Sequence, residues 1–238
     1  IYSMDGSHGF LTSDITLATD IGIYRRRVDF DLIAHRLIYP TLKTSRSALT
    51  GISELLPGQT LQLRDGSCSL TKSWDPWRFV SPEMRYEDPE EAASAIKNAV
   101  EIVVKTVADH DQAVLLELSG GLDSSIVAAC LQRSTARLHC TTITAALPGA
   151  NETDYAAAVT GMLGVDLLET VLRFEDTPFD FPLPRELTSP SVGPLQDAVD
   201  KLMKSSATHF GVNSTFSGAG GDTVFGYLTS AAPAADAF

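Results

Sequence analysis

The sequence lacks the features of a membrane, exported or nucleic-acid-binding protein. It contains no run of 18 apolar residues, which excludes a membrane-spanning helix. It does not open with a basic segment followed by an apolar one, so no export signal is visible. With 18 basic and 30 acidic residues the net charge is −12, which disfavours contact with nucleic acids and anionic membranes. We therefore expect neither a membrane nor a nucleic acid among its partners.

Cysteine is also scarce. The three cysteines, Cys68, Cys130 and Cys140, are odd in number, and their spacing fits no metal site. We therefore expect a reduced, cytoplasmic protein. The chain begins at Ile1 rather than Met, and residues 231–238 resemble the start of a helix. We expect a fragment or a processed chain.

The first region, residues 1 to about 80, is predicted to be β-rich. Polar and apolar residues alternate loosely from Phe10 to Ala18, and residues 31–39 have helical spacing. Two alternating runs on either side of Asp65-Gly66 predict a hairpin. Residues 74–87 are expected to form a linker to the next domain.

From Asp88 onward, predicted helices and strands alternate. Asp88 can cap a helix that Pro89 opens, and apolar residues recur at helical spacing from Ala92 through Ile96, Val103 and Val107. The later elements are strands at 113–118, 138–143, 167–172 and 213–216, and helices at 124–132, 153–163 and 195–210. This order predicts an α/β domain over residues 81–238, with a parallel sheet and helices on its faces. The proline-rich connection 178–194 is a candidate cover for a substrate.

The most specific motif is Leu118-Ser119-Gly120-Gly121-Leu122-Asp123-Ser124-Ser125, between a predicted strand and a predicted helix. Free backbone N–H groups and the positive end of the helix dipole favour phosphate at such a turn. The glycines let the backbone approach phosphate oxygens, and the serines add hydroxyl donors. Asp123 would repel phosphate and is instead expected to bind Mg²⁺. The motif is neither a Walker loop nor a dinucleotide fingerprint.

A second glycine-rich turn, Phe216-Ser217-Gly218-Ala219-Gly220-Gly221-Asp222, also follows a predicted strand. Ser217 and Gly218 are candidates for backbone contact with a nucleotide, and Asp222 supplies a second carboxylate. Parallel strands end at the same edge of a sheet, where α/β sheets bind ligands. Asp123 and Asp222 are therefore expected to converge on one magnesium pyrophosphate.

Both motifs resemble those of the asparagine synthetase superfamily. There the first string is the pyrophosphate loop, and Ser-Gly-x-Gly-x-Asp is the second nucleotide motif. Residues 52–59 and 73–77 are similar to the end of the family's glutaminase-like N-terminal domain, and Leu147-Pro148-Gly149 also fits. The resemblance covers nearly the whole chain. It implies part of a glutaminase-like (Ntn-type) domain over residues 1–80, then an ATP-pyrophosphatase synthetase domain, truncated at its end, over residues 81–238.

The resemblance also implies cofactors, site residues and a reaction. ATP would activate a carboxylate as an acyl-adenylate, which an amine then attacks. The magnesium pair would be Asp123 and Asp222, and these two with Ser119 would be the catalytic residues. The implied nucleotide contacts are Leu118, Ser119, Gly120, Gly121, Asp123, Ser124, Ser125, Ser217, Gly218 and Gly221.

Within the superfamily, residues 218–237 are most similar to lasso-peptide cyclases. Asparagine synthetases usually have Gly-Ala-Asp-Glu where this chain has Gly-Gly-Asp-Thr. A cyclase joins an Asp or Glu side chain of a precursor peptide to the peptide's N-terminal amine. The resemblance thus implies a precursor peptide as substrate, and a leader peptidase and a leader-binding protein as partners.

Three alternatives stay open: a glutamine-hydrolysing asparagine synthetase, a β-lactam synthetase-like enzyme, and a non-catalytic ATP-binding relative. The first needs an N-terminal Cys nucleophile, whereas this chain begins at Ile1. The glutaminase-like part is therefore expected to be truncated or inert. An intact pair of Asp123 and Asp222 argues against the non-catalytic relative. Residues that assist amine attack in the family are expected beyond residue 238.

Overall fold

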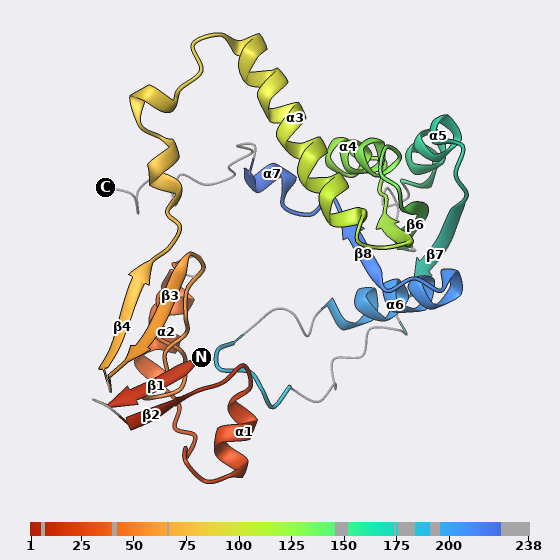
Figure 1. The fold of residues 1–238 in the computed structure, drawn as a ribbon. Helices are drawn as coiled ribbons and strands as arrows, with labels where there is room; N and C mark the ends of the chain where they lie inside the picture. Colours follow the sequence, from red (N-terminus) through yellow and green to blue (C-terminus); the bar gives the residue numbers. More distant parts are fainter. Residues whose placement is uncertain are drawn as a thin grey trace. The chain divides into compact units, whose positions relative to one another are not determined.

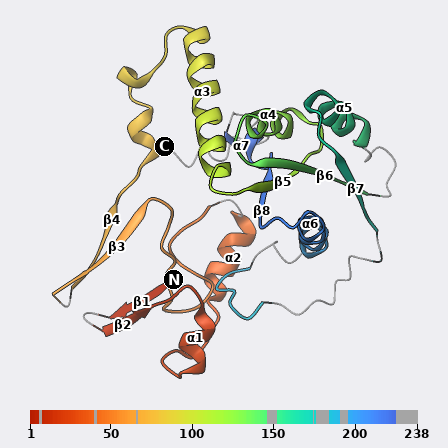
Figure 2. The same cartoon turned by 45° about the vertical axis from the view of Figure 1, so that its right-hand side comes forward.

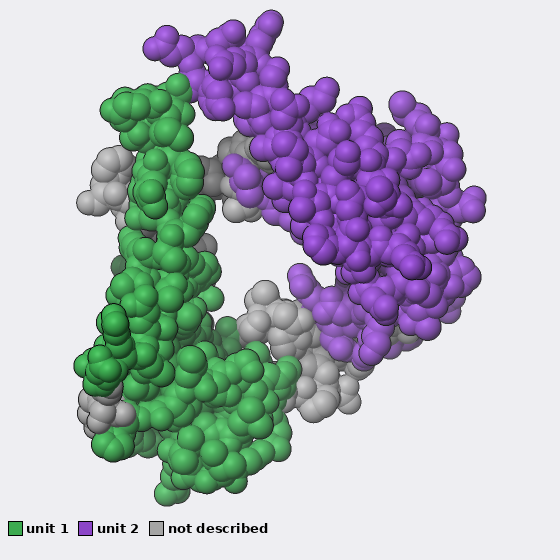
Figure 3. Space-filling model, viewed as in Figure 1, with its two compact units in different colours: residues 1–85, 181–194 green, residues 86–180, 195–238 purple. Residues whose placement is uncertain are grey.

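The chain forms two compact units. A computed structural model describes residues 1–5, 8–39, 42–65, 67–145, 152–173, 175, 184–190 and 196–224. One unit comprises residues 1–85 and 181–194, and the other residues 86–180 and 195–238 (Figure 3). Among the described residues, none of the helices combines the length and the apolar character needed to cross a membrane.

The first unit contains two antiparallel pairs of strands and two short helices. Its elements are β1 Tyr2–Asp5, β2 His8–Leu11, α1 Ile15–Asp20, α2 Phe30–Ile38, β3 Gln59–Arg64, β4 Ser67–Lys72 and the 3₁₀ turns η1 Pro76–Phe79 and η2 Pro82–Met84. The hairpin predicted around Asp65 is confirmed, with Arg64 paired to Ser67, while Gly66 lies outside the described residues. The helix predicted at 31–39 is α2.

The extended stretch predicted from Phe10 to Ala18 is wrong beyond Leu11. Asp14 caps α1, because its Oδ1 accepts a hydrogen bond from the backbone N–H of Thr16 at 2.7 Å. The helix buries Ile15 and Ala18 on one face, at 0% and 2% exposure. Residues Ile15–Asp20 therefore form a capped helix and not the strand that the alternation suggested.

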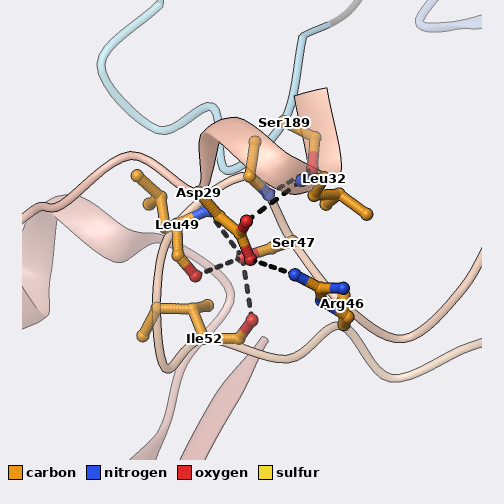
Figure 4. A network of polar contacts seen from close by, with 8 residues as sticks. Asp29, Leu32, Arg46, Ser47, Leu49, Ile52 and Ser189 are labelled. Carbon is orange, nitrogen blue, oxygen red and sulfur yellow. Dashed lines mark hydrogen bonds and ion pairs between the residues drawn. The ribbon is translucent and has the colours of Figure 1, made fainter. Parts of the chain in front are cut away.

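A polar network orders the segment that follows α2 (Figure 4). Asp29 caps α2 by accepting the N–H of Leu32 at 3.0 Å, and its other oxygen pairs with Arg46 at 2.7 Å. The capping bond and then Arg46 hold the pKa of Asp29 below its ordinary value. The buried hydroxyl of Ser47 donates to the carbonyl of Ile52 at 2.8 Å. These bonds satisfy polar groups in a segment that has little regular secondary structure.

Residues 184–190 return from far along the chain to this first unit. The N–H of Ala48 donates to the carbonyl of Thr188 at 2.9 Å and to Ser189 Oγ at 3.2 Å. The hydroxyls of Thr188 and Ser189 both donate to Glu54 Oε1, each at 3.1 Å. Pro178, Pro182 and Pro194 of the connection lie outside the described residues. Its role as a substrate cover stays a prediction.

The second unit is an α/β domain around a four-stranded parallel sheet of order β7-β6-β5-β8 (Figures 1 and 2). Its elements are α3 Pro89–Ala108, β5 Ala113–Glu117, α4 Leu122–Leu131, β6 Arg137–Ala145, α5 Thr153–Leu163, β7 Leu167–Leu172, α6 Asp197–Phe210, β8 Ser214–Ser217 and α7 Gly221–Val224. The predicted parallel α/β arrangement is confirmed.

Helices cover both faces of this sheet. Leu116 of β5 packs in a core with residues of α3, α4 and α5, whereas its neighbour Leu115 packs against α6. Both side chains are fully buried, as expected where alternate residues of a strand meet helices on opposite faces. The parallel pairing of β5 with β8 brings the ends of both strands to one edge of the sheet.

Only some of the apolar side chains of α3 are buried. The predicted helix and its cap at Asp88 are confirmed, since Asp88 Oδ1 accepts the N–H of Glu90 at 2.9 Å. Val104 and Ala108 pack on the core. Val103 and Val107, which share the predicted apolar face, remain 61% and 54% exposed.

Candidate functional site

The site lies where two parallel strands of the second unit end side by side. Glu117, the last residue of β5, is the register partner of Ser217, the last residue of β8. The chain leaves β5 into α4 on one face, and it reaches β8 from α6 on the other face. Such a switch in direction opens a crevice at the carboxyl edge of an α/β sheet.

The first turn is anchored to the core at both ends. The side chain of Leu118 is fully buried, and its N–H donates to the carbonyl of Thr141 at 2.8 Å. Only the backbone of Leu118 is therefore placed to contact a ligand. Gly120 has a φ of +82°, and a Cβ there would lie 2.5 Å from Tyr155 Cβ and 2.6 Å from the N of Ala156. A glycine is required here both by the backbone angle and by the close approach to α5.

Helix α4 begins in this turn with free donors. Gly121 is its N-cap residue, and no side chain caps the helix. The first N–H groups of a helix have no partner within the helix, and they add to the positive end of its dipole. The start of α4 therefore has backbone donors of the kind that bind a phosphate, and the predicted phosphate contact stays a prediction.

The serine hydroxyls of the turn bond mostly to the turn itself. Ser119 Oγ accepts the N–H of Gly121 at 3.1 Å and lies 3.1 Å from Ser124 Oγ. Ser124 and Ser125 each donate to the carbonyl of Gly121, at 3.2 and 2.7 Å. In this arrangement the hydroxyls hold the shape of the loop, and the backbone N–H groups other than that of Gly121 are the donors available to a phosphate.

The second turn packs directly on the first. A Cβ at Gly218 would lie 2.5 Å from the backbone N of Ser124, and a Cβ at Gly221 would overlap the carboxylate of Asp123. Two glycines of the second turn thus allow its backbone to approach the start of α4. Asp222 follows Gly221 directly, so the two predicted carboxylates come from adjoining segments.

Both turns line one cavity of about 360 Å³. Its walls are Glu117, Ser119, Gly121, Leu122, Asp123, Ser124, Ser217, Gly218, Ala219 and Asp222. A cavity of this size falls in the range of small-molecule sites. Of the predicted site residues, Leu118, Gly120, Ser125 and Gly221 do not line it.

The two aspartates fit a nucleotide-bound Mg²⁺. Within the described ranges, no three His, Cys, Asp or Glu residues are grouped as a metal site. A magnesium ion on a nucleotide needs only one or two carboxylates, because phosphates and waters supply its other ligands. Asp123 and Asp222 line the same cavity and satisfy that requirement.

Glu117 lines the cavity but is not among the site residues predicted from the sequence. It ends the apolar strand Ala113–Glu117, and its half-buried side chain lines the cavity. Burial, and then the negative charge of Asp200 in α6, raise the pKa of its carboxyl. A single charged residue at the end of a buried strand, one position before the loop begins, is the signal that identifies it.

Comparisons with known proteins give a family and distant structural similarities, among them two NAD synthetases. The chain is similar to the NH3-dependent NAD synthetase of Campylobacter jejuni subsp. jejuni NCTC 11168 in complex with the nitrate ion. The identity is 16%, with 57% of this chain and 61% of that chain covered and a TM-score of 0.38. It is also similar to the glutamine-dependent NAD+ synthetase of Acinetobacter baumannii in complex with ADP. Here the identity is 19%, the coverage 58% and 28%, and the TM-score 0.42.

The chain thus spans less than two thirds of the length of either structure. No curated protein matches the sequence. The asparagine synthase family matches residues 95–237, a stretch that is more than half of the chain and contains both glycine-rich turns. The chain belongs to the asparagine synthase family.

Proposed function

We propose that the second unit binds ATP and activates a carboxylate as its acyl-adenylate, so that an amine can form an amide. The observation that carries this proposal is the single cavity lined by Asp123, Ser217 and Asp222 at the start of α4. Family membership supports the same reading, because the matched stretch contains every residue of that cavity.

The reaction requires a leaving group, which a carboxylate lacks. Attack of a carboxylate oxygen on the α-phosphate forms the acyl–phosphate bond and breaks the bond to pyrophosphate. The N–H groups at the start of α4 are positioned to stabilise the negative charge that develops on the pyrophosphate. Mg²⁺ held by Asp123 and Asp222 would neutralise part of the same charge. The rest of the catalysis is the alignment of the two reactants within the cavity.

The finer proposal is lasso-peptide macrolactam cyclisation. A precursor peptide would supply the Asp or Glu side chain and the amine, while a leader peptidase and a leader-binding protein would prepare it. The resemblance of residues 218–237 to such cyclases supports this choice, although residues 225–238 lie outside the described part. In this reading the first unit is an inert portion of a glutaminase-like domain, and the protein acts in the cytoplasm.

Two enzymatic alternatives share the adenylating step, namely a glutamine-hydrolysing asparagine synthetase and a β-lactam synthetase-like enzyme. They differ from the cyclase in the acid that is activated and in the amine that attacks. A non-catalytic ATP-binding relative would bind the nucleotide without consuming it. The products therefore separate the cyclase, the asparagine synthetase and the non-catalytic relative, and a β-lactam product would identify the remaining enzyme.

The test is a product assay with the full-length protein, MgATP and one acid at a time. The acids are a candidate precursor peptide without its leader, and free aspartate with ammonia. We expect AMP to form with the peptide, whose mass falls by one water. The same peptide acetylated at its N-terminus is the matched control and should not cyclise. Asparagine formation instead would contradict the cyclase, and bound ATP without AMP from either acid would contradict the enzymatic proposal.

A further inference from the structure

Glu117 occupies a distinct side of the cavity. Side chains alternate along β5, and Leu116 and Leu118 pack in the core on the α4 face. The intervening Glu117 therefore faces the side of α6, which agrees with the effect of Asp200 on its carboxyl. The phosphate-binding donors lie at the start of α4, on the other face. Glu117 thus lies on the opposite face of β5 from those donors.

The carboxylate of Glu117 has no compensating partner among the residues that the structure describes. Within the described part of the chain, no hydrogen bond or ion pair reaches it, although its side chain is half-buried. The negative charge of Asp200 on α6 acts on this carboxyl, and two further carboxylates, Asp123 and Asp222, line the same cavity. A half-buried carboxylate in an acidic cavity is costly unless a ligand brings positive charge.

The charged ligands of the adenylating reaction can be compared at this position. The phosphates and the substrate carboxylate are anions and would be repelled. The described residues do not group Glu117 with Asp123 and Asp222 as a three-carboxylate metal site. The attacking amine remains, because an aliphatic amine reaches the site as a positively charged ammonium at neutral pH.

We propose that Glu117 binds the incoming amine and acts as the base that prepares it for attack, an inference that rests on the proposed adenylating function. The ammonium gives one proton to the Glu117 carboxylate, which becomes a carboxylic acid, and the neutral amine attacks the acyl carbon of the adenylate. The new C–N bond forms as the C–O bond to AMP breaks, and AMP leaves with that electron pair. The second N–H proton passes to solvent.

The environment of Glu117 suits this role. Burial and the charge of Asp200 raise the pKa of the carboxyl, which makes the ionised form a stronger base than an exposed glutamate. The register partner Ser217 places Glu117 beside the second turn, where the nucleotide site begins. An amine held there would lie in the same cavity as the adenylate.

The test compares the two half-reactions in Glu117→Gln. ATP–pyrophosphate exchange reports adenylation, and amide formation reports both steps. Removal of a general base should lower the ratio of amide formation to exchange by about 100-fold. Hydroxylamine is largely neutral at pH 7, so its capture of the adenylate as a hydroxamate should remain close to the wild-type rate. Glu169→Gln, at an exposed position on β7 of the same sheet, is the matched control and should leave the ratio at its wild-type value.

Two outcomes would overturn the inference. A parallel loss of exchange and amide formation in Glu117→Gln would show that the residue serves adenylation. An unchanged ratio would show that it does not assist the amine. If the wild-type protein itself lacked exchange, the proposed function would fail instead, so the two failures are distinguishable.

Discussion

Gly218 is the residue that joins the two turns most closely. A Cβ at this position would meet backbone atoms of α4, at 2.5 Å from the N and 2.9 Å from the Cα of Ser124. Backbone atoms at the start of a helix cannot rotate away as a side chain can. The spacing between the turns, and hence the shape of the cavity, depends on this glycine.

Gly218→Ala should therefore weaken ATP binding by about tenfold or more, since overpacking of this kind costs about 1–3 kcal/mol. Titration calorimetry with ATP would measure it, and thermal unfolding would show whether the fold survives. Gly161→Ala is the control, because a Cβ at that position of α5 meets nothing within 4 Å. Equal ATP affinity in wild type and Gly218→Ala would refute the close packing of the turns.

A second prediction at this scale concerns cysteine reactivity. Cys140 is fully buried in β6, and burial raises its pKa to about 11. At pH 8 only about a thousandth of this thiol would be the reactive thiolate. Iodoacetamide labelling followed by mass spectrometry should modify the half-buried Cys68 first and leave Cys140 unmodified until the protein is unfolded. Labelling of both at the same rate in the native protein would contradict the burial of Cys140.

The sequence predicted the paired aspartates but not every cavity residue. Asp123 and Asp222 converge because parallel strands end at one edge, a rule that needs no coordinates. Glu117 was missed because a polar residue at a strand end is also common at a simple boundary. The loop-internal bonds of Ser119 and Ser124 were not predictable either. They depend on the carbonyl and N–H directions of a turn containing a left-handed glycine.

At the scale of elements, the position where α5 ends is determined by a glycine in its sequence. Gly164 follows the helix with φ 68° and ψ 33°, and its N–H donates to the carbonyl of Thr160. A left-handed residue at this position lets the chain turn into β7, and glycine adopts it without steric cost. The prediction of Gly164 as the residue that ends this helix is confirmed.

Gly164→Ala should lower the free energy of unfolding by about 1 kcal/mol, because a Cβ disfavours the left-handed region. Gly164→Asn should lose less, since asparagine tolerates that region better. Urea unfolding of the two variants beside the wild type would measure the difference. An alanine variant as stable as the wild type would be incompatible with the left-handed end of α5.

Whether a predicted helix or strand was confirmed depended on local features of the sequence. The strand β5 is a short apolar run between two helices, and buried parallel strands have this pattern. At residues 15–18 the alternation of side chains was outweighed by the cap that Asp14 provides. On α3, the spacing predicted the helix but not which apolar residues face the core. Val104 and Ala108 pack there, because the sheet and α4 decide which face is covered.

At the scale of the molecule, the chain divides into two units, and the whole cavity belongs to the second. The return of residues 184–190 to the first unit was not predictable, because it depends on hydrogen bonds between distant segments. Thr188 and Ser189 bond to Glu54 and Ala48 across more than 130 residues. A proline-rich connection contains no local sequence pattern from which such a hydrogen-bonding partner can be predicted.

The most direct test of the central claim is ATP–pyrophosphate exchange by the full-length protein with its acid substrate, compared with Asp123→Asn. Asparagine keeps the size of the side chain but removes the charge that would hold Mg²⁺ on the pyrophosphate. We expect exchange in the wild type and its loss, by at least about 100-fold, in a variant whose circular dichroism spectrum is unchanged. Exchange at the wild-type rate in Asp123→Asn would contradict the assignment of this cavity as the site of adenylation.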